Sequence, residues 1–114
     1  MTEALDELVL LDEVELFEIL GKAINPKDFG PQDVQVYVRL GRAWFQQQAR
    51  RMRQTICSNE GVNALVKGGD RFELFLEAAT VAQAVADMVD QKTIFVFSVL
   101  VAKLGLTAYC GSPE

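Results

Sequence analysis

The chemistry of this chain is concentrated in an arginine cluster. The stretch RLGRAWFQQQARRMRQ, residues 39–54, holds five arginines, which are Arg39, Arg42, Arg50, Arg51 and Arg53. A guanidinium group is planar and always charged, and its N–H donors bind a carboxylate or a phosphate through two parallel hydrogen bonds. The cluster therefore predicts one of two arrangements. It is either a solvated face whose arginines pair with the acidic N-terminal helices of the same chain, or a site for an anionic partner, which is an acidic protein segment or a nucleic-acid backbone.

Amide and aromatic side chains accompany the arginines. Gln35 and Gln46 fill gaps on the arginine face, and with Gln47 and Gln48 they offer further hydrogen bonds to a partner. Tyr37 and Trp44 lie at the edge of the apolar face, where such residues form either the rim of a core or a binding hot spot. The candidate partner-binding residues are Arg39, Arg42, Gln46, Arg50, Arg53, Trp44 and Tyr37.

The residue types that serve most catalytic and metal sites are scarce. The chain has no histidine, which is the most common general base and metal ligand. It also lacks a Walker loop and the GxGxxG and GxSxG motifs. Carboxylate pairs such as Glu73 with Glu77 are typical of solvated helix faces. We therefore predict a non-enzymatic protein with no cofactor, no metal and no small-molecule substrate.

Charge is distributed unevenly along the chain. Eleven Lys and Arg residues against sixteen Asp and Glu residues give a net charge of −5. Seven acids fall within the first eighteen residues, and no basic residue precedes Lys22. A net negative charge disfavours non-specific attraction to nucleic acid or to anionic membranes. A general nucleic-acid coat is thus excluded, whereas a local arginine patch opposite an acidic segment is not.

The two cysteines and one apolar run bear on the compartment. Cys57 and Cys110 can form one bridge at most, and such a sparse count without a signal peptide favours two buried thiols in a reducing, cytoplasmic environment. The apolar run within residues 93–110 ends at Ala102 before Lys103, and a spanning helix needs about 20 apolar residues. We therefore predict a buried core element there and no membrane span.

Helical signals begin near the N-terminus. The apolar residues change phase near Leu11, and the positions that follow, Val14, Phe17, Leu20 and Ile24, keep helical spacing. Asp12 with Glu15 three residues later matches a capping box. We expect two short helices, or one bent helix, ending by Asn25-Pro26.

A long helix from about Pro31 to Thr55 is expected to carry the arginines. Its apolar stripe is Val34, Val38, Gly41, Phe45, Met52 and Ile56. Its basic stripe, which we call the arginine ridge, is Arg39, Arg42, Arg50 and Arg53. Each set falls within an arc of about 80° at helical phase. Alternation of Val34, Val36 and Val38 with polar residues also fits a short strand near 34–40, but the two stripes favour a helix.

The remaining segments of the chain are also predicted to be helical. Ser58 is expected to cap a short helix stopped by Gly68-Gly69, and Asp70 with Glu73 to open a helix that reaches Asp90. The last element starts after Thr93, and its β-branched content leaves a strand near 93–101 as the alternative. The fold class is therefore all-α, a compact bundle of five or six helices, with α+β as the alternative. Residues 1–110 form one domain and residues 111–114 a frayed tail.

These observations favour a protein-protein interaction or adaptor module. Such a module either associates with itself, with the acidic segment of one copy on the arginine ridge of another, or docks as a small subunit of a larger assembly. An acidic antitoxin or immunity-type inhibitor of a basic protein is a special case of this class. The alternative is a small nucleic-acid-binding subunit that uses the ridge on the phosphate backbone.

Overall fold

The computed structural model describes residues 5–24, 34–68 and 73–110. Within them the chain forms helices and no strand, which confirms the all-α prediction. The helices are α1 (Leu5–Leu8), α2 (Glu13–Ile24), α3 (Val34–Cys57), α4 (Glu60–Lys67), α5 (Leu74–Ala84), α6 (Gln91–Leu104) and α7 (Leu106–Cys110). The alternative strands near 34–40 and 93–101 are wrong, because both segments are helical, in α3 and α6.

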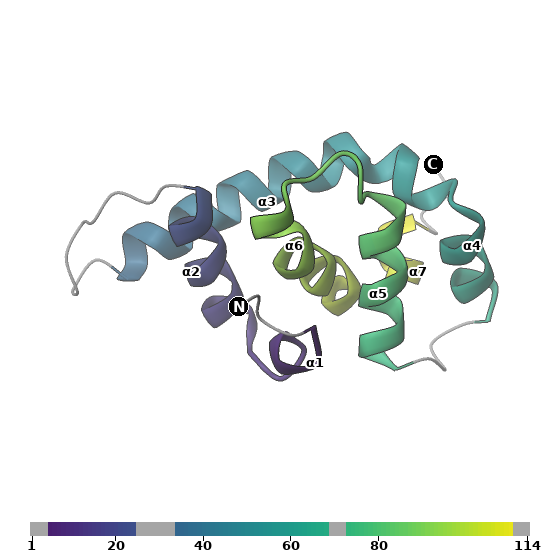
Figure 1. Ribbon diagram of the computed structural model, residues 1–114, viewed down its shortest axis with the longest axis horizontal. Helices are drawn as coiled ribbons and strands as arrows, with labels where there is room; N and C mark the ends of the chain where they lie inside the picture. The colour runs from purple at the N-terminus through teal and green to yellow at the C-terminus, as the bar shows by residue number, and fades with distance from the viewer. Residues whose placement is uncertain (1–4, 25–33, 69–72, 111–114) are drawn as a thin grey trace.

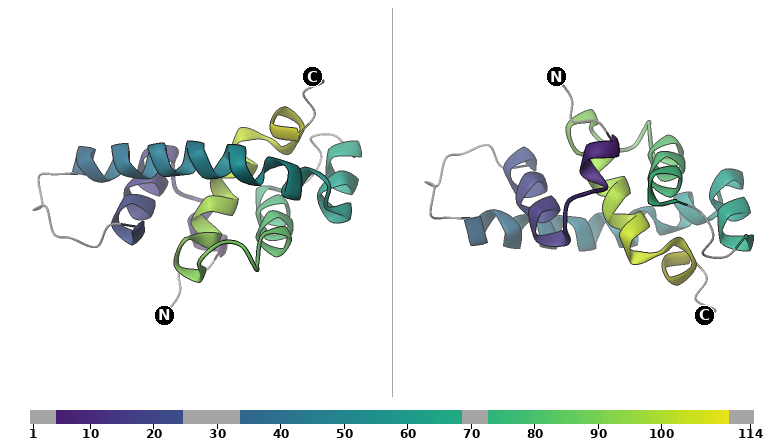
Figure 2. Two further views of the ribbon diagram at one scale, coloured as in Figure 1. Left: turned by 90° about the horizontal axis from the view of Figure 1, so that it is seen from above. Right: turned by 90° about the horizontal axis from the view of Figure 1, so that it is seen from below.

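Helix α3 is the longest element and organises the others (Figure 1). Its 24 residues span about 36 Å at the α-helical rise, against a longest molecular extent of 44 Å. Helix α2 crosses its N-terminal half, α6 packs near its middle, and α5 and α7 lie on opposite sides of its C-terminal half (Figure 2). A site on α3 is therefore walled by elements distant in sequence.

The N-terminal segment forms two helices. Helices α1 and α2 are separated by a turn, and the predicted capping box is present at the start of α2. The backbone N–H of Glu15 donates to Asp12 Oδ1 at 2.8 Å, and the N–H of Asp12 donates to Glu15 Oε1 at 3.0 Å. Because these bonds satisfy free donors at the helix start, they fix where α2 begins. The expected end at Asn25-Pro26 lies outside the described residues.

Helix α3 shows the two stripes that its sequence predicts. Four residues of the apolar stripe, Gly41, Phe45, Met52 and Ile56, are buried, whereas Val34 is exposed and Val38 is half-buried. All four arginines of the basic stripe are exposed. The helix runs to Cys57, two residues beyond the expected end, and the expected start at Pro31 lies outside the described residues.

The contact between α2 and α3 depends on two glycines. A Cβ atom built on Gly41 would overlap the carbonyl oxygen of Phe17, and one built on Gly21 would overlap the carbonyl oxygen of Tyr37. The two helix backbones therefore touch at their crossing, with no room for a side chain on either side. This approach presses Phe17 of α2 against Phe45 of α3, with ring centroids 5.9 Å apart.

The expected bounds of α4 and α5 need correction. Asn59, and not Ser58, caps α4, since its side chain accepts a hydrogen bond from the Val62 N–H at 3.1 Å. Helix α5 ends at Ala84 instead of reaching Asp90, because the chain turns through residues 85–90 and buries Val85 and Val89 there. The expected cap Asp70 lies outside the described residues, and Glu73 makes no side-chain cap.

The C-terminal segment is broken at one glycine. Helix α6 begins after Asp90, whose carbonyl oxygen accepts the Thr93 hydroxyl at 3.1 Å, so Thr93 lies inside the first turn and does not cap from outside it. Gly105 has φ +93°, a left-handed conformation that glycine adopts without strain, and it ends α6 and redirects the chain into α7. The predicted tail, residues 111–114, lies outside the described residues.

All seven described helices contribute to one apolar core. Helix α6 lies at its centre, with Phe97, Val99 and Val101 fully buried. The Phe97 ring packs on Phe45 at 5.6 Å between centroids and meets the edge of Trp44 at 6.2 Å. The apolar run that resembled a membrane segment is thus a core helix, as predicted. Among the described residues no helix is long and apolar enough to span a bilayer.

Candidate functional site

Three of the predicted arginines line one open groove. The groove has a volume of about 790 Å³ and is bordered along α3 by Arg42, Gln46, Arg50 and Arg53. Arg39 is exposed on the same helix but does not line the groove. The structure therefore divides the predicted ridge into a groove-lining part and an outlying residue. We call this feature the arginine groove.

The floor and opposite wall of the arginine groove are largely apolar. Helix α2 supplies Glu13 and Phe17, α3 supplies Phe45 and Ala49, α6 supplies Leu104, and α7 supplies Ala108 and Tyr109. Leu104 is 48% exposed, and Phe17 and Phe45 are buried beneath the opening. The volume lies in the range of about 300–1,000 Å³ that is usual for binding pockets. Guanidinium groups above an apolar floor suit a partner that carries both a carboxylate and an apolar group.

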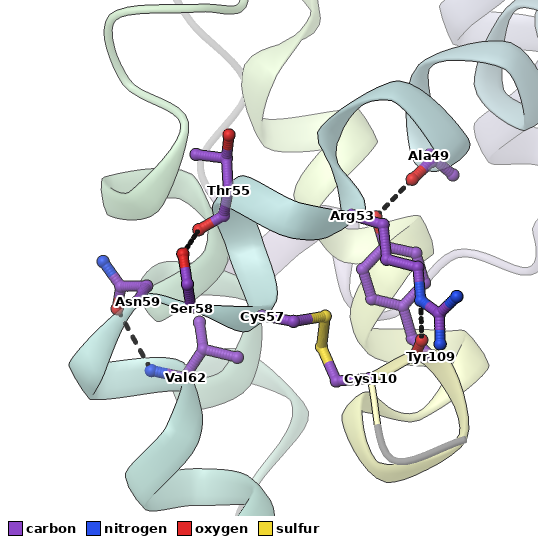
Figure 3. The surroundings of a disulfide bond; sticks show 9 residues. All are labelled: Ala49, Arg53, Thr55, Cys57, Ser58, Asn59, Val62, Tyr109 and Cys110. Atoms are coloured by element: carbon purple, nitrogen blue, oxygen red, sulfur yellow. Dashed lines mark hydrogen bonds between the residues drawn. A yellow bond between two sulfur atoms is a disulfide. The ribbon is translucent and has the colours of Figure 1, made fainter. Parts of the chain in front are cut away.

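Two of the groove arginines are oriented by neighbouring groups. The Arg42 guanidinium carbon lies 5.1 Å from the centroid of the Phe17 ring, a cation–π distance. The Nε–H of Arg53 donates to the carbonyl oxygen of Tyr109 at 3.1 Å (Figure 3). The side chain of Arg50 makes no hydrogen bond or ion pair with any residue that the structure describes. The groove therefore presents positive charge whose guanidinium N–H donors remain available to a ligand.

The acidic N-terminal helices do not neutralise these arginines within the described ranges. The ion pair found there joins Lys22 to Glu18 along α2, at 2.9 Å. Glu13 lines the arginine groove, yet none of Arg42, Arg50 and Arg53 is within ion-pair distance of a carboxylate in the described ranges. Arg51, off the basic stripe, donates to Gln48 at 3.1 Å. The acidic surface thus borders the arginine groove at Glu13 but forms no ion pair with Arg42, Arg50 or Arg53.

Tyr109 closes the groove at the α7 end, and sequence reasoning missed it. Its hydroxyl donates to the carbonyl oxygen of Ala49, and its own carbonyl accepts from Arg53 (Figure 3). Burial raises the pKa of Tyr109 to about 12, and the positive charge of Arg53 opposes part of that rise. The phenol therefore stays protonated and continues to donate its hydrogen bond. A single tyrosine near the C-terminus gives no local signal of such a contact.

The prediction of two buried thiols was wrong. Cys57 at the end of α3 and Cys110 at the end of α7 form a disulfide, with 5.4 Å between their Cα atoms (Figure 3). Both cysteines are only half-buried. The two cysteines stand 53 positions apart, so the sequence gives no local signal of their proximity, which arises because α7 folds back onto the end of α3. Since disulfides persist mainly in oxidising environments, the argument for a reducing compartment no longer holds.

The two aromatic candidates lie in the packed interior more than on the groove. Tyr37 is 6% exposed, and the Lys22 ammonium sits 5.5 Å from its ring centroid. Trp44 is half-buried with its edge-to-face contact on Phe97. Neither residue lines the arginine groove. The sequence left open whether these residues form the rim of the core or a binding hot spot. Trp44 fits the rim of the core, and Tyr37 is more deeply buried than a rim residue.

A second groove is apolar and lies elsewhere. It has a volume of about 580 Å³ between α1, α5 and α6, and its lining includes Leu5, Phe75, Ile94 and Phe95. Phe75 is 44% exposed. The lining contains two glutamines and no charged residue. This surface can take apolar groups but offers no charge to orient them, so the arginine groove is the more specific site.

The described part of the chain shows no cluster of metal ligands. No group of three or more His, Cys, Asp or Glu side chains there is arranged to hold a metal ion. Comparison with protein-family models, with curated proteins and with solved structures finds no match to this chain. Functional inference therefore rests on the arginine groove and its chemistry.

Proposed function

We propose that this chain is a non-enzymatic protein-protein interaction module that binds an acidic segment of its partner in the arginine groove. The observation that carries the proposal is the placement of Arg42, Arg50 and Arg53 above the apolar floor formed by Phe17 and Phe45. A carboxylate next to an apolar side chain meets both chemistries at once. Charge complementarity then provides specificity and a fast association rate.

The same geometry argues against the nucleic-acid alternative. A phosphate backbone is best followed by a continuous basic track with exposed aromatic residues for stacking. Here Arg39 lies outside the groove, Tyr37 is buried, and Glu13 sits on the groove wall. The net charge of −5 adds long-range repulsion. An acidic protein segment, whose charges are fewer and more local, fits this site better than a polyanion.

The test is a binding titration at low salt with three fluorescent probes. They are a synthetic helical peptide of leucines flanked by glutamates, the same peptide with lysines in place of glutamates, and a single-stranded oligonucleotide. We expect the glutamate peptide to bind and the lysine peptide not to bind. Tighter binding of the oligonucleotide would favour the nucleic-acid alternative instead.

Variants then locate the binding site. The double substitution Arg42→Gln with Arg50→Gln is expected to weaken glutamate-peptide binding about tenfold or more, because two charge-assisted contacts are lost. Arg39→Gln with Arg51→Gln removes the same charge from the same helix outside the groove and serves as the matched control. Equal losses in both pairs would contradict the groove as the binding site.

The location of this interaction remains a prediction. The cytoplasmic expectation rested partly on reduced cysteines, and the Cys57–Cys110 disulfide removes that support. Alkylation of free thiols in intact cells, followed by mass analysis of the purified chain, gives the oxidation state of both cysteines in their native compartment. Alkylated Cys57 and Cys110 would favour the cytoplasm, and an unmodified, bridged pair would favour an oxidising compartment.

A further inference from the structure

We infer that the partner segment is supplied by a second copy of this chain, whose α1–α2 turn places Leu10 in the arginine groove. This inference rests on the proposed function, because it uses the same groove, and it names the occupant. The turn, residues 9–12, and its flanking acids are called the acidic tip. The inference joins two features that remain unmatched within one copy, an exposed leucine among acids and exposed arginines above an apolar floor.

The acidic tip presents an apolar side chain in a fixed turn. Leu10 is 83% exposed, the highest value among the exposed large hydrophobic residues. Its backbone N–H donates to the carbonyl oxygen of Glu7 at 3.2 Å, and the neighbouring N–H of Leu11 donates to that of Leu8 at 3.1 Å. Leu8 is buried in the core and anchors the turn from beneath. A preformed turn loses little conformational entropy on binding.

Acidic residues flank this leucine in the sequence. Glu7 and Asp12 are exposed on either side of it, and Glu15 lies one turn further on. The capping box uses Oδ1 of Asp12 and Oε1 of Glu15, so each carboxylate keeps a second oxygen for an arginine. The tip therefore has the composition that the groove requires, an apolar anchor with carboxylates beside it.

One copy does not satisfy its own groove. Leu10 is not among the residues that line the arginine groove, and its exposure shows that nothing in the described chain covers it. Glu13, three residues along, does line the groove. The acidic tip thus borders the groove without entering it. A second copy can bring the tip to the groove, and since each copy carries one tip and one groove, the contact is self-complementary across two copies.

The dependence of self-association on salt distinguishes this contact from a purely apolar one. Each copy has a net charge of −5, so two copies repel at long range, and added salt screens that repulsion and strengthens any apolar association. A contact held by carboxylates on arginines weakens instead, because salt screens its attraction. We therefore expect self-association to decrease as the salt concentration rises, although the net charge alone predicts the opposite.

The experiment is sedimentation equilibrium of the full oxidised chain over a concentration series, at low salt and at about 1 M salt, where the Debye length is about 3 Å. We expect dimers or larger assemblies at low salt and monomers at high salt. Leu10→Ser and the Arg42→Gln with Arg50→Gln pair are each expected to weaken association about tenfold or more. Met88→Ser, another exposed large apolar residue, and Arg39→Gln with Arg51→Gln are the matched controls.

Mixing the two defective variants tests the pairing directly. Leu10→Ser keeps an intact groove, and the Arg42→Gln with Arg50→Gln chain keeps an intact tip, so the mixture should form heterodimers at concentrations at which each variant alone is largely monomeric. Circular dichroism of each variant checks that the fold is unchanged. Failure of the mixture to form heterodimers, or association that strengthens with salt, would overturn the inference.

The outcomes also separate this inference from the proposed function. A chain that stays monomeric at every concentration yet binds the glutamate peptide in its groove would leave the proposed function standing and remove the second copy as its partner. A chain that neither associates nor binds the peptide would remove both. Association that persists in the groove variant but is lost on Phe75→Ser would assign the interface to the second, apolar groove and overturn the inference.

Discussion

The two halves of α3 are held in the fold by different means. At the N-terminal half, α2 crosses at Gly21 and Gly41 with the two backbones in contact, and it buries Leu16, Phe17 and Leu20. At the C-terminal half, α7 has only five residues, of which Leu106 is buried, and it is joined to α3 by a disulfide. The twelve-residue α2 buries one amphipathic face, whereas the five-residue α7 buries one large side chain and is in addition linked covalently to α3.

This difference matters for the arginine groove because its walls come from both regions. Phe17 reaches the groove from the glycine-packed side, and Tyr109 from the disulfide-linked side. The ring of Phe17 contacts Arg42, and the carbonyl oxygen of Tyr109 accepts a hydrogen bond from Arg53. One side of the groove is therefore held by close helix packing and the other by a covalent bond. Breaking either support should affect a different wall.

The largest effect is expected from loss of the disulfide. Closing a loop of this length stabilises the folded chain by about 4 kcal/mol in the chain-entropy model. Reduction should lower the free energy of unfolding by about that amount and should increase amide exchange in α7 more than in α2. Denaturation with and without reductant measures the first effect, and hydrogen exchange measures the second. Cys57→Ser with Cys110→Ser is the control, since reductant should not change its stability.

The next effect is expected from Gly41→Ala. Helix propensity alone predicts a gain of about 1 kcal/mol, but the new Cβ overlaps the Phe17 carbonyl oxygen, so we expect a net loss of about 2 kcal/mol. Chemical denaturation of the oxidised chain provides the measurement. Ala43→Gly, at an exposed position of the same helix, isolates the propensity term, at about 1 kcal/mol lost. A stabilised Gly41→Ala chain would mean that the two backbones do not touch.

The smallest effect is expected from Tyr109→Phe, and it depends on pH. Near neutral pH the lost hydrogen bond to Ala49 should cost about 1 kcal/mol. Because burial raises the pKa of Tyr109 to about 12, against about 10 in the unfolded chain, the folded state retains the phenol proton more strongly. Its contribution is complete below about pH 10 and is lost as the pH rises toward 12.

The pH dependence separates Tyr109 from the other titrating groups. The wild-type chain should lose stability between about pH 10 and about pH 12 more steeply than the phenylalanine variant, since only the wild type has this phenol to ionise. Denaturation midpoints of both chains across that range give the comparison. Parallel profiles would show that the Tyr109 hydroxyl is not buried against α3.

Sequence reasoning succeeded where the signal is local. The capping box of Asp12 with Glu15 links residues three apart, and both of its hydrogen bonds are present. The stripes of α3 arise from helical phase, so they correctly placed the arginines on an exposed face. It failed at the end of α5, where the chain buries Val85 and Val89 in a turn instead of continuing the helix to Asp90. It also gave no signal of the break at Gly105, where a positive φ ends α6.

What the sequence by itself determined, then, is the helical class, the start of α2, the course of α3 and the charge of its exposed face, because each depends on residues within one or two turns of one another. Only the tertiary structure decided that Cys57 meets Cys110, that Gly21 lies against Gly41, and that Tyr109 supports Arg53. These contacts join residues 20 to 56 positions apart. The periodicity of residues within one helix cannot predict these contacts, because they depend on how whole helices pack against one another. The same packing places apolar walls beside the basic stripe of α3 and so forms the arginine groove.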